Sequence, residues 1–360
     1  MELKGYKTKP GLICITSCIR DILNYNQFDV NESMVFVASK ANMFYYEKFD
    51  IEKDSRIRIG GIYYDVLKVI NNVLDYMQIN MVHNNNETHD CILEFIKSNI
   101  DAGRPVLTIL SRKYLDYMND AFKDNIPHCV NIIGYDLKKG TLRVSDVYIP
   151  TKPISTYEGD LSIENYLKCI DYARDVFNNK FLFNCISLQT ERSKKFNEFP
   201  YEKLIEPICA AGDIYLNQHH TIHHNIFVGK TALLQFYDNI MYWFDVKENK
   251  DLKGLLTNIH NRLVDYGGMV TTNRFFSEYM EFLYEHTGNN KFVKLQDDFK
   301  YISKRWFIVA NILCKSVFME SHDTKINLDN RLSEIINLEE ALWDKILKIL
   351  DENGAYDTYV

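Results

Sequence analysis

The chain has 360 residues, of which 46% are hydrophobic and 25% charged, and a net charge of −7 at pH 7. This composition is typical of a soluble globular protein of two domains, and the negative charge gives no support for nucleic-acid binding. No signal-peptide-like segment or membrane-spanning apolar run occurs, so we expect a cytoplasmic protein without a membrane partner. The eight cysteines include no CxxC pair, which favours reduced thiols over disulfides or structural zinc.

The first predicted helix follows Pro10 and Gly11 and ends near Tyr25, with isoleucines at helical spacing. Cys14 falls in its first turn, where unpaired N–H groups and the positive end of the helix dipole favour a thiolate. Cys14 is therefore a candidate nucleophile. The alternative is a small hydrophobic residue that packs near the end of a helix.

A second helix, capped by Asn31, Glu32 and Ser33, is predicted to run into an aromatic patch that includes Tyr45 and Tyr46. The two tyrosines could line an acyl pocket or pack in the core. Further predicted elements follow in chain order, namely a strand at 56–64, a helix at 63–76, a strand at 78–83, a helix at 90–99 and a buried strand at 105–111.

Residues 127–150 predict a β-hairpin, with strands from His128 to Tyr135 and from Leu142 to Val147. A turn centred near Lys138 would pair residue 146 with residue 130. Asp146 would then lie diagonally across from His128, within reach of a hydrogen bond. This arrangement suits a histidine base that a carboxylate holds in one tautomer, with Cys14 as the nucleophile.

After a helix at 162–173 and a strand at 181–189, a polar stretch ending in Pro200 suits a linker. The remaining chain is patterned almost wholly as helices, and the tail after Glu352 is expected to fray. The predicted helices span roughly 201–217, 227–245, 251–266, 272–287, 293–318 and 338–351.

Two features of this helical half suggest ligands. HHTIHH at 219–224 could hold a metal if it were helical, but no third ligand or HExxH glutamate is evident, and exposed histidines explain it better. We therefore predict no metal site. Gly267 and Gly268 precede a helix, where free N–H groups with Arg274 nearby could receive an anionic substrate group. A glycine helix stop followed by a new helix start explains the same residues.

The order of a helix-start cysteine, a strand histidine and a hairpin acid resembles papain-like enzymes. HCVNIIGYD with Asp146 after it is similar to the C39 peptidases that process bacteriocins. Most of residues 10–318 resembles the butirosin biosynthesis protein H family, through CITSCIRDILNYN, FDVNESMVFVASKANMFYY, HCVNIIGYD, GKTALLQFYDNI and YGGMVTTNRFFSEYMEFLYE. This resemblance implies an α+β protein, with a papain-like (C39-like) cysteine protease fold over 1–192. An all-α helical domain over 200–352 would cover the cleft and shape the acceptor site.

The resemblance implies that Cys14 is the nucleophile, His128 the general base and Asp146 its orienting acid, while Cys18 packs in the core. The implied reaction moves an acyl, aminoacyl or peptidyl group from a carrier-protein thioester to a small amine in natural-product biosynthesis. Because the thioester on the carrier's phosphopantetheine arm is already activated, no bound cofactor is required. The expected partners are an acyl or peptidyl carrier protein and the amine acceptor, and the sequence is compatible with an oligomer.

Two positions depart from the related families. The family often has His before the nucleophile, where this chain has Ile13. Papain-like peptidases place an oxyanion-binding Gln six residues before the cysteine, and here that position is Thr8. Either the Thr8 hydroxyl or the backbone N–H of Cys14 could replace it. Two alternative functions remain open, namely a C39-like cysteine peptidase or amidase and a non-catalytic binding protein.

Overall fold

The computed structural model describes residues 1–40, 42–47, 58–62, 66–84, 88–120, 127–151, 153–176, 185–189, 195–216, 221–223, 226–246, 249–265, 267–317 and 322–351. The chain divides into two compact units, each made of two segments. The first unit comprises Met1–Val35 and Asp65–Glu198, and the second comprises Phe36–Tyr64 and Phe199–Val360.

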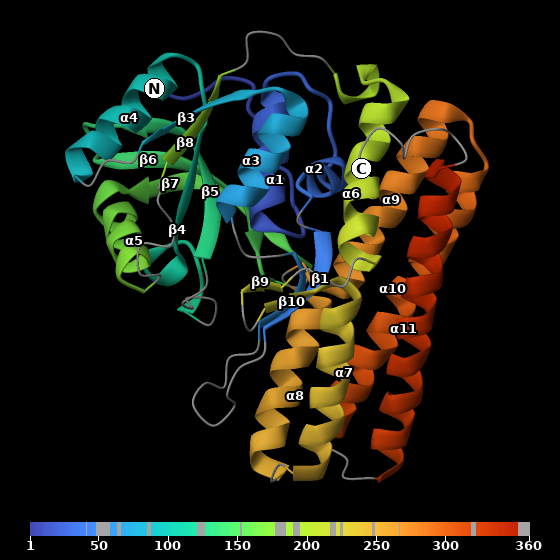
Figure 1. Cartoon of the computed structure of the whole chain (residues 1–360). Coiled ribbons are helices and arrows are strands. Elements are labelled where there is room, and N and C mark those ends of the chain that lie inside the picture. The colour runs from blue at the N-terminus through green and yellow to red at the C-terminus, as the bar shows by residue number, and fades with distance from the viewer. Residues whose placement is uncertain are drawn as a thin grey trace. The chain divides into compact units, whose positions relative to one another are not determined.

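The first unit is an α+β structure built around a six-stranded sheet (Figure 1). The sheet order is β3-β8-β4-β5-β6-β7, and neighbouring strands pair antiparallel. Its strands are β3 (Asn80–Asn84), β4 (Val106–Ser111), β5 (Pro127–Asp136), β6 (Thr141–Ile149), β7 (Ser155–Ser162) and β8 (Cys185–Gln189). The helices are α1 (Cys14–Tyr25), α3 (Val66–Met77), α4 (His89–Asp101) and α5 (Ile163–Val176), with short 3-10 turns η1 (Arg112–Tyr114) and η3 (Phe196–Glu198). Helix α2 (Glu32–Ala38) crosses the boundary between the units.

The predicted hairpin is confirmed as β5 and β6. Asn131 lies opposite Ser145, which is the register that the predicted pairing of residues 130 and 146 requires. The register shifts between Ile132 and Gly134, so a bulge interrupts the ladder before the turn. Strand β7 continues the meander beyond β6, and the sequence did not predict it because its residues alternate weakly between apolar and polar.

Helix α1 packs against β5 and β6 because its apolar face is buried from Ile15 to Leu23. A polar contact also fixes it to the sheet. The Asn131 side chain of β5 donates to the Cys18 carbonyl at 2.9 Å and to the Tyr6 hydroxyl at 2.7 Å. The Cys18 thiol in turn donates to the Cys129 carbonyl at 3.4 Å, and it is fully buried as predicted. These bonds fix the position of α1 along β5 and therefore the position of its first residue.

The second unit is a group of long helices with a small antiparallel sheet, ordered β2-β1-β10-β9 (Figure 1). Helix α10 packs against α8, α9 and α11. The helices are α6 (Tyr201–Leu216), α7 (Gly229–Val246), α8 (Asn249–Val264), α9 (Met269–Thr287), α10 (Lys291–Ser316) and α11 (His322–Asp351). The strands are β1 (Asn42–Glu47), β2 (Arg58–Ile62), β9 (Thr221–His223) and β10 (Ile226–Val228).

The sheet of the second unit joins two distant parts of the sequence. Tyr45 of β1 lies opposite Val228 of β10, and Phe44 of β1 stacks on Trp306 at 5.5 Å between ring centroids. The sequence prediction placed residues 36–64 inside a continuous 1–192 domain, whereas they group with the helical unit. The predicted strand at 56–64 is confirmed as β2, and so is the helical C-terminal region, but β9 and β10 add strands to a region expected to be all-α. Short strands that pair only with distant residues carry no local pattern that would reveal them.

Among the residues that the structure describes, no helix is both long enough and apolar enough to cross a membrane. Helix α11 begins about four turns before the predicted start at residue 338, because the polar first half of the helix has a weak apolar stripe. The proposed linker falls partly outside the described residues. Its last part is not loose, since Phe196 is buried and packs against Tyr76 at 5.7 Å. The expected fraying after Glu352 and the start of the strand at 181–189 also lie outside the described residues.

Candidate active site

Cys14 is the first residue of α1, and its side chain is partly exposed. Ile13 precedes the helix in an extended conformation without a side-chain cap. The first i to i−4 bond runs from the Ser17 N–H to the Ile13 carbonyl at 3.0 Å. The N–H groups of residues 14 to 16 therefore have no partner inside the helix, and they present partial positive charge next to the Cys14 sulfur.

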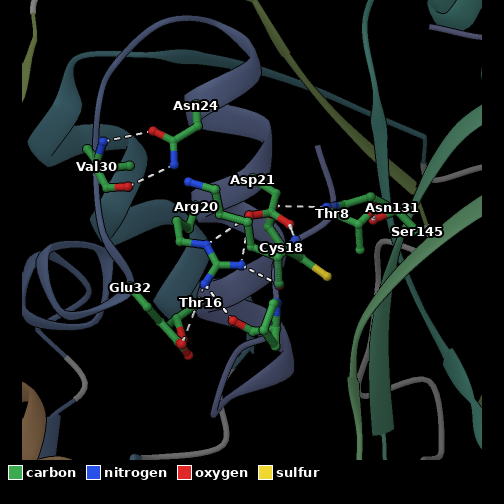
Figure 2. Close-up of polar contacts among 12 residues, drawn as sticks. Thr8, Thr16, Cys18, Arg20, Asp21, Asn24, Val30, Glu32, Asn131 and Ser145 are labelled. Atoms are coloured by element: carbon green, nitrogen blue, oxygen red, sulfur yellow. Dashed lines mark hydrogen bonds and ion pairs between the residues drawn. The ribbon is translucent and has the colours of Figure 1, made fainter. Parts of the chain in front are cut away.

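A buried carboxylate fixes the segment that leads into Cys14. Glu32 of α2 accepts the backbone N–H groups of Leu12 at 3.0 Å and Ile13 at 2.9 Å. It also accepts the Thr16 hydroxyl at 3.0 Å (Figure 2). One side chain therefore holds both flanks of Cys14. Burial raises the pKa of Glu32, although the Leu12 and Ile13 N–H groups and Arg20 oppose the rise. The sequence marked Glu32 only as part of a helix cap, and no local signal points to Cys14.

Arg20 and Asp21 of α1 form a second anchor for the same segment. Arg20 donates to the carbonyls of Pro10 at 3.1 Å and Lys9 at 2.6 Å, while Asp21 accepts the Lys9 N–H at 3.0 Å (Figure 2). Arg20 and Asp21 also pair with each other at 2.7 Å, and both are buried. A charge pair buried in this way is costly to form but rigid once it is fully hydrogen-bonded. Hydrogen bonds therefore fix the backbone segment that leads to Cys14.

His128 and Asp146 form the hydrogen bond predicted from the hairpin. His128 Nε2 lies 2.8 Å from Asp146 Oδ2, and both side chains are buried. The other Asp146 oxygen accepts the backbone N–H of Tyr148 at 3.0 Å. Because Nε2 is used by Asp146, Nδ1 is the nitrogen that remains for the bond between His128 and Cys14. Cys14, His128 and Asp146 therefore form one continuous chain of contacts.

The environment of Cys14 lowers its thiol pKa well below the ordinary value. The largest cause is a hydrogen bond from the Cys129 thiol to the Cys14 sulfur, followed by burial, which opposes the effect, and by His128. The same contact raises the pKa of Cys129, so of the two thiols it is Cys14 that ionises. Cys129 follows His128 directly in the sequence, but nothing in its spacing predicted this contact.

The pKa of His128 rises to about 9. Burial alone would lower it, because a low-dielectric site disfavours the imidazolium. The Asp146 carboxylate and the Cys14 sulfur outweigh that penalty. The two shifts favour a Cys14 thiolate beside a protonated His128, which is a nucleophile paired with its proton donor.

The Thr8 hydroxyl, one of the two predicted oxyanion donors, is hydrogen-bonded to other side chains. It lies 2.7 Å from Glu158 Oε2 and 2.8 Å from Ser145 Oγ. Because a carboxylate can only accept, the single Thr8 proton goes to Glu158. The alternative donor, the backbone N–H of Cys14, lies at the helix start and has no intrahelical partner. This geometry favours Cys14 N–H as the oxyanion donor.

The other candidate substrate residues lie in the second unit. Tyr45 and Tyr46 are only 2% and 1% exposed, which supports the core-packing alternative over an acyl pocket. Tyr46 packs against Phe236 at 6.0 Å. Arg274 is exposed on α9 and pairs with Glu278 at 2.8 Å. Gly268 is the residue before α9, as expected for a helix start, and the substrate role of Arg274 stays a prediction.

The histidine cluster at 219–224 lies largely outside the described residues. Only 221–223 are described, as strand β9. Within the described part of the chain, no three His, Cys, Asp or Glu side chains form a group that could hold a metal ion.

Residues 13–147 match the N-terminal domain of the butirosin biosynthesis protein H family. This match supports the resemblance inferred from the sequence for that part of the chain. The matched range begins one residue before Cys14 and ends one residue after Asp146, so it contains all three residues of the contact chain. No curated protein matches the chain.

Proposed function

We propose that the protein is a cysteine-dependent N-acyltransferase of natural-product biosynthesis. The match to a butirosin biosynthesis family supports a biosynthetic enzyme of the transferase class. The observation that carries the finer proposal is the contact chain from Cys14 at the start of α1, through His128, to the buried Asp146, inside the matched range. The donor would be an acyl, aminoacyl or peptidyl thioester on the phosphopantetheine arm of a carrier protein.

In the first half-reaction, the Cys14 thiolate attacks the thioester carbonyl carbon. The carbonyl oxygen becomes an oxyanion that the Cys14 N–H can stabilise at the helix start. The C–S bond to the carrier then breaks, and the leaving thiolate takes the proton from His128. The products are a free carrier thiol, an acyl-Cys14 thioester and a neutral His128.

In the second half-reaction, an amine attacks the acyl-Cys14 carbonyl and His128 takes a proton from the amine nitrogen. The C–S bond to Cys14 breaks and an amide forms, which restores the thiolate and the imidazolium. An amide is more stable than a thioester, so the donor drives the reaction without further energy input. Water must be kept from the acyl-enzyme, because hydrolysis would compete with the amine.

The same residues would serve a cysteine peptidase or amidase, which is the second candidate. The structure offers no Gln donor ahead of Cys14, since Thr8 stands at that position and gives its proton to Glu158. An amide substrate needs more oxyanion stabilisation than an activated thioester does. This difference favours the thioester as the acyl donor.

The test is intact-protein mass spectrometry after mixing the enzyme with an acyl N-acetylcysteamine thioester. We expect one acyl adduct on the wild type, none on Cys14→Ala, and discharge of the adduct by added amines. Cys18→Ala is the matched control, because this cysteine lies one turn along the same helix and is fully buried. Release of free acid without amide, or cleavage of peptides, would indicate hydrolysis. An adduct that survives in Cys14→Ala would overturn the assignment of the nucleophile.

A further inference from the structure

A tyrosine outside the three-residue contact chain bonds the same carboxylate oxygen as His128. The hydroxyl of Tyr117, which follows η1, donates to Asp146 Oδ2 at 3.0 Å. That oxygen is 2.8 Å from His128 Nε2, and Asp146 is fully buried. Asp146 Oδ2 is therefore shared between two donors, in a place where water does not screen its charge.

The Tyr117 ring is held so that its hydroxyl cannot easily leave this oxygen. It stacks on Tyr157 of β7 with 4.0 Å between ring centroids and 6° between ring planes. The Tyr157 hydroxyl does not reach Asp146, because it donates to the Asp160 carbonyl at 3.0 Å. Of the two stacked tyrosines, only Tyr117 bonds to the Asp146 carboxylate. Removing the hydroxyl of Tyr157 is therefore a matched control for removing that of Tyr117.

A hydrogen bond to a carboxylate oxygen draws off part of its negative charge and makes it a weaker acceptor for any second donor. We propose that Tyr117 is a positioning residue for the acyl-transfer site, whose hydroxyl limits how strongly Asp146 holds the proton on His128. This inference rests on the proposed roles of Cys14 and His128. Without the hydroxyl, Asp146 would hold the imidazolium proton more tightly, and His128 would give it up more slowly to the departing carrier thiol.

Several other titratable groups surround Asp146, His128 and Tyr117, and their ionisation has to be distinguished from that of His128. They are Cys14 and Cys18 on α1, Cys129 on β5, Tyr157 on β7 and Cys169 on α5. Burial raises the pKa of Cys18 and of Tyr157, and the hydrogen bond to Cys14 raises that of Cys129. We therefore assign the alkaline change in Cys14 reactivity to His128, whose pKa is about 9, and the acid-side change to Cys14 itself.

The experiment measures the rate of Cys14 alkylation by iodoacetamide against pH in the wild type, Tyr117→Phe and Tyr157→Phe. Tyr117→Phe keeps the ring stack and removes only the hydroxyl. We expect its alkaline transition to move upward by ~0.5 to 1 pH unit, because part of the strength of the lost hydrogen bond to the Asp146 carboxylate passes to its bond with His128. Tyr157→Phe should leave the transition in place.

A second measurement follows acyl-adduct formation from the thioester surrogate at neutral pH. With His128 holding its proton more tightly, we expect Tyr117→Phe to form the adduct ~3- to 10-fold more slowly, in line with Brønsted behaviour for proton transfer. Incorporation of 3-fluorotyrosine at position 117, which makes the hydroxyl a stronger donor, should move the alkaline transition downward. This variant keeps the fold even if the phenylalanine variant does not.

An unmoved or lowered transition in Tyr117→Phe would overturn the role of Tyr117, as would an equal shift in Tyr157→Phe. The alkylation profile needs no acyl donor, so it separates this inference from the proposed function. If the profile shifts as expected but the wild type forms no acyl adduct, the role of Tyr117 in tuning His128 stands and the acyl-transfer proposal fails.

Discussion

At the scale of single residues, Cys129 has the most specific effect on the nucleophile. Its thiol hydrogen bond is the largest cause that lowers the pKa of Cys14. Cys129→Ala should therefore raise the Cys14 pKa, because the thiolate loses a hydrogen-bond donor that favours the charged form. Cys129→Ser keeps a donor and should shift it less. The acid-side transition of iodoacetamide alkylation measures both, and identical profiles for wild type and Cys129→Ala would contradict the assignment.

Glu339 is a buried carboxyl group in the second unit that takes no part in the proposed chemistry. Burial raises its pKa to about 7, although donors such as Trp306 Nε1, at 2.6 Å from Glu339 Oε1, oppose the rise. The unfolded chain, with a pKa near 4.5, releases this proton at lower pH than the folded protein does. Between these two values the folded state binds more protons, so its stability falls as the pH rises from about 4.5 to about 7.

Glu339→Gln removes this dependence. The free energy of unfolding of the variant, relative to that of the wild type, should increase by up to about 3 kcal/mol from pH 4 to pH 8. This value follows from about 1.36 kcal/mol per pKa unit. Urea unfolding at both pH values gives the difference. Glu340→Gln is the neighbouring control, since that side chain is 41% exposed and pairs with Lys230 at 2.5 Å. A difference between Glu339→Gln and wild type that does not vary with pH would contradict this account.

At the scale of elements, the start of α1 depends on a close backbone approach at Gly11. A Cβ atom at this position would lie 1.7 Å from the Ser17 Oγ and 3.1 Å from Glu32 Oε2. The Gly11 N–H also donates to the Val147 carbonyl of β6 at 3.0 Å, one residue after Asp146. The tight approach thus connects the helix that carries Cys14 to the strand that carries Asp146.

Gly11→Ala should push the chain away from the first turn of α1 and misalign Cys14 with His128. We expect a loss of ~2 kcal/mol or more in stability, within the range for overpacking, and slower acyl-adduct formation. Gly254→Ala in α8 is the matched control, because a Cβ there meets nothing within 4 Å. That change should be neutral or stabilising by up to ~1 kcal/mol through helix propensity. Urea unfolding and the mass-spectrometric assay compare the two, and equal stabilities would contradict the steric argument.

At the scale of the whole molecule, the second unit is not a continuous C-terminal domain. Its sheet takes β1 and β2 from residues 36–64, and Phe44 packs on both Trp306 and Phe236. A fragment of residues 199–360 would therefore expose the β10 edge and leave the site of Phe44 empty.

We expect fragment 199–360 to lack a cooperative unfolding transition, because it lacks two of the four strands of its sheet. Adding a synthetic peptide of residues 36–64 should restore part of the transition, while a peptide with Phe44→Ala should restore less. Circular dichroism during urea titration follows each mixture. Cooperative unfolding of the fragment alone would show that residues 36–64 are not part of its core.

The sequence by itself determined the elements whose signals are local. The isoleucine spacing after Gly11 predicts α1, and the alternating strands on either side of the Lys138 turn fix the register that brings Asp146 to His128. A hairpin places residues close in sequence opposite one another, so its geometry can be deduced without the rest of the fold. The helices of the C-terminal half carry periodic apolar stripes and were found for the same reason.

Only the tertiary structure decided which distant residues complete the site. Glu32, Tyr117 and Cys129 carry ordinary local signals. Their contacts with the residues flanking Cys14, with Asp146 and with Cys14 exist because α1, α2 and the sheet pack together. The same holds for Thr8, whose proton is directed to Glu158 on β7, and for the strands β1 and β10, which pair across more than 170 residues. Contacts of this kind arise from burial and hydrogen-bond satisfaction in the folded chain, which no short stretch of sequence encodes.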